Sequence, residues 1–308
     1  MSKRKQKNPE FTAEMTRECA KAPVVATAHG PKNILILHPG TMGHVVGACL
    51  VSVGHRVAWV SAGRSLATAA RASASGLSAY GSLSAALQDT DIILSVCPPE
   101  AAPDVAAEIA GARFAGLYID ANAISPETAR RIDRTISEAG GVMVDGGIVG
   151  PPPTEPGRAR LFLSGPNAAE AAALFSGTAL EAIPIGPDIG AASALKMAYA
   201  AWTKGTSALF LAIRALARAE GIEATLAEEW RRSQPALVGA KAEAARQSVA
   251  KAWRFAGEMR EIADSFANNS LPDGFHLAAA DVYEALADFK DDGSADVEAA
   301  VERLMPTR

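Results

Sequence analysis

The residues best suited to chemistry lie in a glycine-containing turn that reads His-Pro-Gly-Thr-Met-Gly. Because Gly40 has no Cβ, the backbone there can approach a pyrophosphate held at the N-terminus of a following helix, and Gly43 allows that helix to pack closely against the preceding strand. Thr41 and Met42 lie between them as further predicted contacts. His38 occupies the position of the first glycine in the usual G-x-G-x-x-G pattern, so we expect a slightly different loop. The turn predicts a dinucleotide-binding site.

The segments on either side of this turn have the pattern of a β-α-β unit. Asn33 to Leu37 is almost wholly apolar, which predicts a strand buried on both faces. Apolar residues at helical spacing predict a helix at about residues 41–53, and Gly54 with His55 follows it. A second apolar run, Arg56 to Val60, predicts the next strand. The glycines therefore lie at the strand-to-helix turn, where a dinucleotide site needs them.

The end of the second predicted strand indicates which dinucleotide is bound. A fold that selects NAD normally has Asp or Glu there, to bind the ribose 2′-hydroxyl. This chain has no acid at that position and instead carries Ser61, Arg64 and Ser65, which suit the 2′-phosphate of NADP. In the alternative interpretation, Arg64 is a solvated residue at the start of a helix and Ser65 is only its N-cap.

The composition places the chain among ordinary globular proteins. Of its 308 residues, 49% are hydrophobic and 21% are charged, and the formal net charge of −4 gives no basic surface for nucleic acid. Apolar runs are too short to span a membrane, which takes roughly 18 residues. The three cysteines are widely spaced, so we expect reduced thiols, no metal site and a cytoplasmic location. Cys97 and Pro98 follow another predicted strand and are assigned to the cofactor site, although the description of Cys97 as a small buried hydrophobe is the favoured one.

The first 31 residues differ from the rest. They contain a basic cluster near the start, but no apolar signal-peptide core follows it. This composition predicts a disordered or weakly ordered extension.

Strands alternate with helices up to about residue 188. The expected strands after the first two are 91–96, 116–120, 142–144 and 160–164, the last two being the final strands of the sheet. Alternation of this kind predicts a Rossmann-type α/β domain at residues 32–188, with a doubly wound, mostly parallel sheet. From residue 189 to 308 only helical patterns occur, which predicts an all-α C-terminal domain. It begins with one helix of about 30 residues and continues with helices near 225–233, 236–250, 252–268, 276–288 and 295–304.

Four motifs in order resemble the β-hydroxyacid dehydrogenase superfamily, which includes 6-phosphogluconate and 3-hydroxyisobutyrate dehydrogenases. The resemblance covers about residues 33–290 and is closest, in the C-terminal half, to the branch with an alternative phosphogluconate-dehydrogenase-like helical domain. The motifs are the glycine turn closed by Gly54-His55-x-Val57, the segments Asp120 to Pro126 and Asp145 to Gly150, and the helix start Gly190 to Met197.

The resemblance implies hydride transfer between a nicotinamide and a carbon that bears oxygen, with Lys196 as the general acid/base. Such a reaction moves a proton at the oxygen together with the hydride. Lys196 lies on an otherwise apolar helix face, and burial there would lower its pKa towards the useful range. The alternative is a lysine whose stem is buried while its ammonium group reaches solvent.

The departures from the family pattern concern the residues around this lysine. The family commonly has Asn one helical turn later, where this chain has Ala200. At about 100° per residue, Thr203 lies about 20° and Tyr199 about 60° from Lys196 around the helix axis. Tyr199 and Thr203 are therefore predicted to take over the hydrogen-bonding role of the missing Asn.

The resemblance also locates the predicted substrate contacts. Asn122 is expected to bind the nicotinamide amide or a substrate oxygen. Val149 replaces a family serine and so removes a donor for a substrate carboxylate, but backbone N–H groups at Gly147 and Gly150 could still bind an anion. His276 is either a substrate contact, supplied to the partner's active site, or a residue at the start of a helix.

These observations predict an NADP-dependent oxidoreductase acting on a 3-hydroxyacid-like alcohol or the matching carbonyl. Two alternatives stay open: a reductase of imines or bulkier carbonyls, against which Lys196 weighs, and a non-catalytic NADPH-binding protein. The long C-terminal helix is apolar on several faces, which predicts a homodimer. No nucleic-acid or membrane partner is expected.

Overall fold

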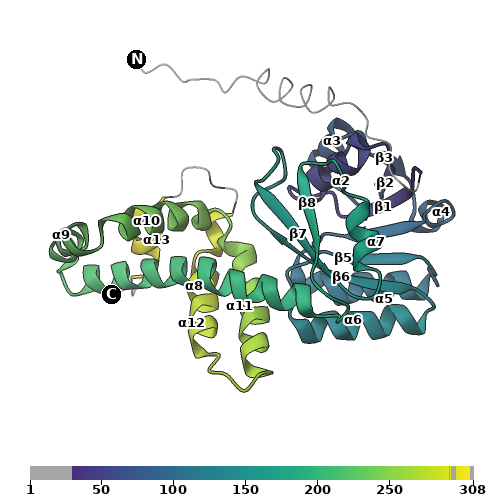
Figure 1. Cartoon of the computed structure of the whole chain (residues 1–308). Coiled ribbons are helices and arrows are strands. Elements are labelled where there is room, and N and C mark those ends of the chain that lie inside the picture. Colours follow the sequence, from purple (N-terminus) through teal and green to yellow (C-terminus); the bar gives the residue numbers. More distant parts are fainter. Residues whose placement is uncertain (1–29, 291, 293–295, 306–308) are drawn as a thin grey trace, which may run out of the picture. The chain divides into compact units, whose positions relative to one another are not determined.

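The computed structural model describes residues 30–290, 292 and 296–305 (Figure 1). All but the last two residues of the predicted N-terminal extension lie outside this range. The described chain forms two compact units. The sheet unit contains residues up to Cys97 together with 101–122 and 129–192, and the helical unit contains residues 98–100, 123–128 and those from Ser193 onward.

One sheet runs through the sheet unit in the order β3-β2-β1-β4-β5-β6-β7-β8. Neighbouring strands are parallel except for β6 and β7, which are antiparallel. Helices cover both faces, as expected for a doubly wound fold (Figure 1). The strands are β1 (Asn33–Leu37), β2 (Arg56–Val60), β3 (Ser78–Tyr80), β4 (Ile92–Ser95), β5 (Leu117–Asp120), β6 (Val142–Val149), β7 (Ala159–Ser164) and β8 (Leu180–Pro184).

The helices of this unit follow the strands in alternation. Apolar side chains from the central strands, such as Ile36, Leu94 and Ile119, form the core together with Val46 and Leu50 of the first helix. The helices are α2 (Gly43–Ser52), α3 (Leu66–Ala74), α4 (Leu83–Leu87), the 3-10 turn η1 (Pro99–Ala101), α5 (Ala102–Gly111), α6 (Pro126–Glu138) and α7 (Ala168–Ala173).

The predicted fold class is confirmed, but the prediction of the last strands is wrong. The strand at 160–164 is followed by β8, which pairs in parallel with β7. Strand β6 is also five residues longer than expected, because Asp145 to Val149, in the motif that contains the predicted substrate contact Gly147, pairs with β7.

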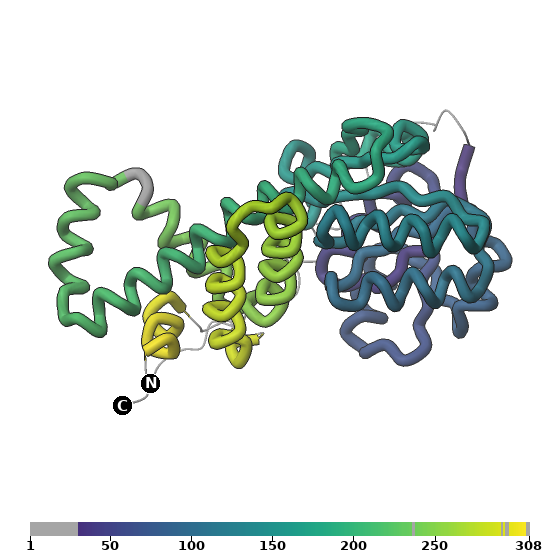
Figure 2. Tube along the Cα trace, turned by 90° about the horizontal axis from the view of Figure 1, so that it is seen from below, coloured from purple at the N-terminus to yellow at the C-terminus, as the bar shows by residue number. Residues whose placement is uncertain are grey.

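The helical unit is built around α8 (Ala191–Ala219), whose predicted length is confirmed. Its core contains Met197 and Leu211 of α8, Met259 and Ile262 of α11, and Tyr283 of α12. Figure 2 shows α11 and α12 side by side. The other elements are α9 (Glu223–Ser233), α10 (Pro235–Val249), α11 (Ala252–Ala267), α12 (Gly274–Ala285), η2 (Ala287–Phe289) and α13 (Val297–Arg303). In the described part of the chain, no helix has the length and apolar character needed to cross a membrane.

Candidate active site

The glycine turn joins β1 to α2 in a tight conformation. His38 has a φ of 66°, the left-handed region that glycine adopts at little cost and other residues rarely adopt. The N–H of Gly40 donates to the His38 carbonyl oxygen at 2.7 Å. A Cβ on Gly43 would lie 2.6 Å from the same oxygen, so only glycine fits where α2 begins. His38 thus adopts the backbone conformation that the usual first glycine would supply.

The N-terminus of α2 is suited to hold an anion. Met42 at the N-cap position makes no side-chain hydrogen bond, and the first turn contains no acidic residue. The first N–H groups of a helix carry partial positive charge and need partners. The absence of a side-chain cap on α2 therefore fits a bound pyrophosphate, with Thr41, Met42 and Gly43 at the contact.

His38 and Arg64 lie near each other on this side of the sheet unit. Burial, and then the charge of Arg64, lowers the pKa of His38 to about 4, so the imidazole is neutral at physiological pH. Its Nδ1 is buried and has no hydrogen-bond partner among the described residues. Arg64 itself is exposed. The predicted contact of Arg64 with a 2′-phosphate stays a prediction.

The two predicted serines already have structural roles. Ser61 Oγ donates to the Tyr80 carbonyl oxygen at 3.0 Å. Ser65 is the N-cap of α3, since its Oγ accepts from the N–H of Thr68 at 3.2 Å. Both hydroxyl groups keep hydrogen-bonding capacity, and their contact with a 2′-phosphate stays a prediction.

Asn122 links the carboxyl ends of β4 and β5. Its Oδ1 accepts from the N–H of Cys97 at 2.6 Å, and its Nδ2 donates to Ser95 Oγ and Asp120 Oδ2, each at 3.0 Å. Both amide hydrogens are therefore used within the protein. Only a second lone pair on Oδ1 remains for the predicted contact with a nicotinamide or substrate group. Pro98 follows this junction and begins the short segment that belongs to the helical unit.

Two buried carboxyl groups are neighbours in the sheet, Asp120 on β5 and Asp145 on β6. Burial, with a further contribution from Asp145, raises the pKa of Asp120 to about 7 against the opposing hydrogen bonds from Asn122. Asp145 Oδ2 accepts from Ser164 Oγ and from the N–H of Gly190, each at 2.9 Å. Ser164 Oγ in turn accepts from the N–H of Ala192 at 3.0 Å. These bonds cap the first turn of α8.

The two glycines assigned to substrate binding lie at β6. Gly147 is buried inside the strand, opposite Phe162 of β7. Gly150 follows the strand with a φ of 117°, and a Cβ there would lie 2.3 Å from the Arg158 carbonyl oxygen. The return of the chain into β7 therefore explains this glycine. Binding of an anion by either backbone N–H stays a prediction.

Lys196 occupies the first part of α8 and is surrounded by other charges of the helical unit. Burial, followed by the charges of Lys204 and Arg254, lowers the pKa of Lys196 to about 8, while Glu258 acts in the opposite direction. The amine can therefore both accept and donate a proton near neutral pH, as a general acid/base must.

The two residues predicted to assist Lys196 differ in environment. Tyr199 is 47% exposed. Thr203 Oγ1 donates to the Tyr199 carbonyl oxygen at 3.2 Å, one turn back along α8. The hydroxyl proton of Thr203 is thus used by its own helix, as is common for Thr in helices. Its oxygen keeps acceptor capacity, so the predicted role of either residue is neither supported nor excluded.

His276 is buried at the start of α12. Its ring packs against Phe266, with 4.3 Å between ring centroids, and it also faces α8 at Gly205. Burial lowers its pKa, and its Nδ1 has no partner among the described residues. Gly205 lies nine residues beyond Lys196, so His276 of the same chain meets α8 well away from that lysine.

Sequence reasoning missed the charged residues of α11. Lys204 and Glu258 form a buried ion pair, with side chains that are 13% and 9% exposed. Glu261 Oε2 accepts from the N–H of Ser125 at 2.5 Å and from Thr128 Oγ1 at 3.1 Å. Ser125 Oγ in turn accepts from the N–H of Thr128 at the start of α6. The only signal in the sequence was the helical spacing of Arg254, Glu258 and Glu261. Arg260 and Asp264 of the same helix are charged as well, so this spacing did not single them out.

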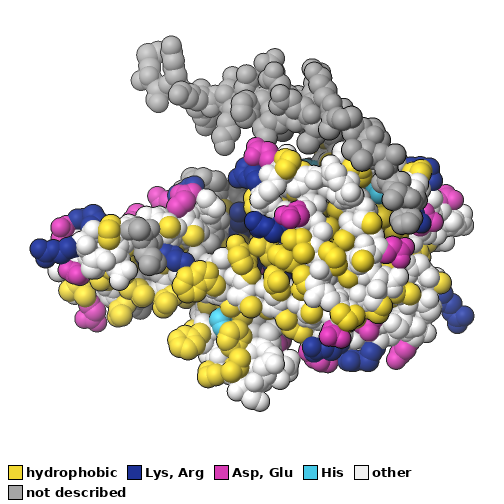
Figure 3. Space-filling model, in the orientation of Figure 1, with side chains coloured by type: hydrophobic (Ala, Val, Ile, Leu, Met, Phe, Trp, Pro, Cys, Tyr) yellow, Lys and Arg dark blue, Asp and Glu magenta, His cyan; other side chains and the backbone are white. Residues whose placement is uncertain are grey.

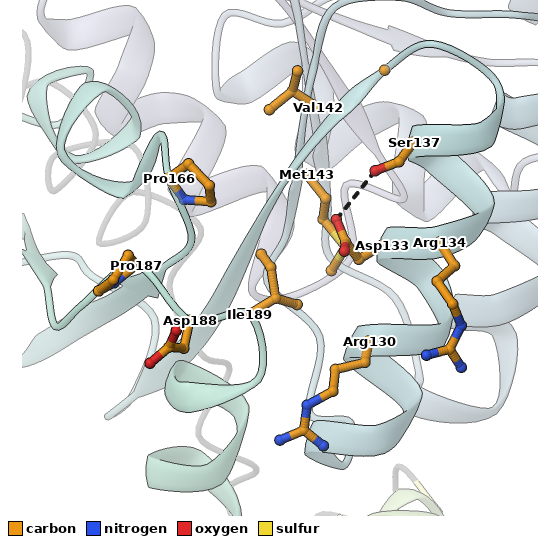
Figure 4. A pocket seen from close by; sticks show the side chains of 11 residues that line it. Arg130, Asp133, Arg134, Ser137, Val142, Met143, Pro166, Pro187, Asp188 and Ile189 are labelled. Atoms are coloured by element: carbon orange, nitrogen blue, oxygen red, sulfur yellow. Dashed lines mark hydrogen bonds between the residues drawn. The ribbon is translucent and has the colours of Figure 1, made fainter.

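A separate surface pocket lies at the opposite edge of the sheet. It has a volume of about 840 Å³, and Figure 4 shows Arg130, Asp133 and Arg134 of α6 around it. Asp133 accepts from Ser137 Oγ at 3.4 Å. The pocket adjoins the first residues of β6, Val142 and Met143, whereas ligands of doubly wound folds bind beyond the carboxyl ends of the strands. We do not assign it to the cofactor.

Two parts of the chain match known family models. Residues 35–175 match the family model for the NAD binding domain of 6-phosphogluconate dehydrogenase, and residues 217–286 match a domain of unknown function, DUF1932. An uncharacterized 28.5 kDa protein of Methanothermus fervidus is 32% identical over 161 residues, which are 52% of this chain and 61% of that protein. The chain thus matches less than two thirds of this curated relative.

Solved structures share the fold over nearly the whole chain. A conserved protein of unknown function, described as structurally similar to 3-hydroxyacid dehydrogenases, is 27% identical with a TM-score of 0.62, covering 85% of this chain and all of that one. The 3-hydroxyisobutyrate dehydrogenase of Mycobacterium tuberculosis is 20% identical with a TM-score of 0.67, covering 90% of this chain and all of that one. Imine reductases also have this fold. The chain therefore combines an NAD-binding domain of the 6-phosphogluconate dehydrogenase family with a helical DUF1932 domain, in the fold shared by 3-hydroxyisobutyrate dehydrogenases and imine reductases.

Proposed function

We propose that this protein is an NADP-dependent oxidoreductase that interconverts a 3-hydroxyacid-like alcohol and the matching carbonyl compound, with Lys196 as the general acid/base. The environment of Lys196 carries the proposal. Its pKa is lowered to about 8 by burial and neighbouring cations, in a chain that also contains a nicotinamide-binding domain. A protein that only bound the cofactor would have no use for such a proton carrier.

The nicotinamide, when bound, supplies the acceptor or donor of the hydride. The chain's own task is to hold the cofactor and to move one proton at the substrate oxygen. In the oxidative direction the neutral amine of Lys196 takes the hydroxyl proton as the carbon loses its hydride. In the reductive direction the ammonium form gives that proton to the carbonyl oxygen.

The preference for NADP is part of the proposal and rests on Arg64. It is exposed, its charge reaches His38 at the glycine turn, and no acid follows β2 to bind a ribose 2′-hydroxyl. A guanidinium group suits a phosphate because its planar N–H groups can bind two oxygens at once.

Association into a homodimer is also proposed. On α8 the side chains of Trp202, Leu209 and Leu216 recur every seven residues and are 64%, 56% and 62% exposed. Phe275 at the start of α12 is more exposed still, and Figure 3 shows hydrophobic side chains gathered over α8 and α12. Burial of this face against a second copy would remove a large apolar surface from water. The cytoplasmic location expected from the sequence stays a prediction.

The test of the proposed function is a screen of the purified protein against 3-hydroxyacids with NADP⁺ and against carbonyl compounds with NADPH, followed by nicotinamide absorbance. Imines formed from ketones and amines are included as a separate set. Turnover of hydroxyacids that depends on Lys196 supports the proposal. Turnover of imines alone would favour the reductase alternative, and tight NADPH binding without turnover of any class would favour the non-catalytic one.

A further inference from the structure

Lys196 has several charged neighbours in the helical unit, and most of those that act on it are cations. Three further cations, Lys204, Lys251 and Arg254, lie close enough to one another to affect each other or Lys196 electrostatically. The carboxylate in their midst is Glu258, whose pKa is lowered by Lys204, Lys196 and Arg254 in spite of the opposing effect of burial. Glu258 forms its ion pair with Lys204, so these two charges compensate each other. Positive charge on Arg254 and Lys251 remains.

Arg254 has no charged partner of its own. Its Nε is buried without a hydrogen-bond partner, and among the described residues no carboxylate forms an ion pair with its guanidinium group. The contact it makes is with Phe255, whose ring centroid lies 5.4 Å from the Arg254 Cζ. Lys204 Nζ lies 4.8 Å from the same centroid. The ring therefore packs against both cations.

An unpaired guanidinium in a half-buried position is unfavourable unless a ligand compensates it. Removing a charged group from water costs several kcal/mol unless an opposite charge or hydrogen bonds replace the lost hydration. Arg254 lies on α11 one turn before Glu258, with Lys251 at the N-cap position three residues earlier. Lys251 and Arg254 are thus on the same side of α11 as Glu258, whose charge acts on Lys196.

We propose that Arg254, assisted by Lys251, binds the carboxylate of the substrate. This inference rests on the proposed function, because it assigns the acid group of a substrate whose hydroxyl or carbonyl oxygen reacts at Lys196. It also answers a difficulty raised by the sequence, since Val149 offers no hydroxyl group to a carboxylate. A guanidinium group binds a carboxylate through two parallel hydrogen bonds, which makes Arg254 the residue that selects acids over neutral alcohols.

Equilibrium binding tests the assignment without turnover. The full chain, saturated with NADP⁺, is titrated with 3-hydroxypropionate, with the neutral 3-hydroxypropionamide and with 3-hydroxypropyl phosphate, and dissociation constants are measured by NMR or calorimetry. We expect the acid to bind at least about tenfold more tightly than the amide, because one charge-assisted hydrogen-bonded pair contributes about that factor to the affinity.

Variants then identify the residue. Arg254→Gln should weaken binding of the acid by about 10- to 100-fold and leave the amide unchanged, and Arg254→Lys should keep a measurable part of the preference. The matched control is Arg260→Gln, on the same helix, where the arginine is exposed and paired with Glu284. It should change neither constant. Melting temperatures of all variants show whether they fold.

Three results would overturn the proposal. One is that the unmodified protein binds the acid and the amide equally well, or binds neither of them. Another is an Arg254→Gln protein that keeps the preference. The third is a phosphate ester that binds more tightly than the acid, which would assign the cations to a phosphorylated substrate. If only the proposed oxidoreductase function is wrong, the result differs from these three. The acid would still bind through Arg254, but the protein would show no turnover.

Discussion

The ammonium group of Lys204 is paired with the carboxylate of Glu258 in the interior of the helical unit, and both charges act on Lys196, two helical turns earlier on α8. Lys204 lowers the pKa of Lys196 and Glu258 raises it. Burial has the largest effect on how readily Lys196 gives up its proton, and the two charges of the pair modify that effect in opposite directions.

The first prediction concerns pH. Because the pKa of Lys196 is about 8, its neutral form becomes the major one only above that pH. The kcat for alcohol oxidation should therefore rise as pH increases through about 8, while the kcat for carbonyl reduction should fall over the same range. Profiles measured in both directions with one substrate pair check this. Parallel profiles in the two directions would contradict it.

Replacement of Lys196 by alanine should leave the fold and NADP⁺ binding intact but reduce kcat by about 10²–10⁴-fold, the usual contribution of a general acid/base. Single-turnover rates and cofactor titrations on the same preparation separate chemistry from binding. Arg260→Gln in the same unit serves as a comparison, because that arginine is exposed and paired with Glu284. A Lys196→Ala protein within about threefold of the parent would exclude the proton-carrier role.

Arg64→Ala should weaken the binding of NADP⁺ by about 1.5–3 kcal/mol, or one to two decades in affinity, and leave the binding of NAD⁺ almost unchanged. The reason is that only NADP⁺ carries the 2′-phosphate. Fluorescence titration with both cofactors measures the difference. Arg158→Ala provides a control in the same unit, since that arginine forms an exposed ion pair with Glu155. Equal affinity of the unmodified protein for both cofactors would refute the preference.

Glu258→Gln should lower the free energy of unfolding by about 3–5 kcal/mol, because it leaves the Lys204 ammonium buried without its partner. The double variant Lys204→Met/Glu258→Leu should lose less, since neither charge then remains. In the parent, the pKa of Glu258 is lowered, so its stabilising contribution is present above the ordinary pKa of about 4.5 and is lost as pH falls through the lowered value. Urea unfolding at several pH values measures both effects.

The proposed homodimer predicts a particular response to charge on α8. Leu209→Asp should shift the protein from about twice the single-chain mass of 31.8 kDa towards that mass, measured by light scattering at micromolar concentration. Leu66→Asp, which changes a leucine that is 90% exposed on α3, should have no such effect. An unmodified protein that is already monomeric would rule out the assembly.

Local patterns predicted the centre of the fold well. β1 and β2 begin and end at the expected residues, and α8 is within one residue at each end, because continuous apolar runs and glycine stops mark these elements. β3 and β8 were missed. Ser78–Tyr80 is only three residues long, and Leu180–Pro184 is largely accessible and ends in proline, so their strand conformation depends on pairing with a neighbour at the edges of the sheet.

The candidate site was predictable only in part. The glycine turn is local, so its residues could be found in the sequence. The paired residues Lys204 and Glu258 are 54 residues apart in the sequence, and the hydrogen bond from the Ser125 N–H to Glu261 spans 136 residues. No spacing rule within one helix predicts such pairs. Asn122 was predicted as a ligand contact from its place in a family motif. Its hydrogen bonds to Ser95 and Cys97 could not be predicted, because they depend on two strands being adjacent.

The capped first turn of α8 has a consequence for unfolding. Gly190 and Ala192 bond to Asp145 and Ser164 of the sheet, whereas from Ser193 onward the same helix belongs to the helical unit. A helix with its start in one unit and its length in the other loses support when either one melts. Calorimetry should therefore show one transition with equal calorimetric and van't Hoff enthalpies. Proteases should find no cleavable linker at the last crossing between the units, since the chain passes from Ala192 to Ser193 inside α8.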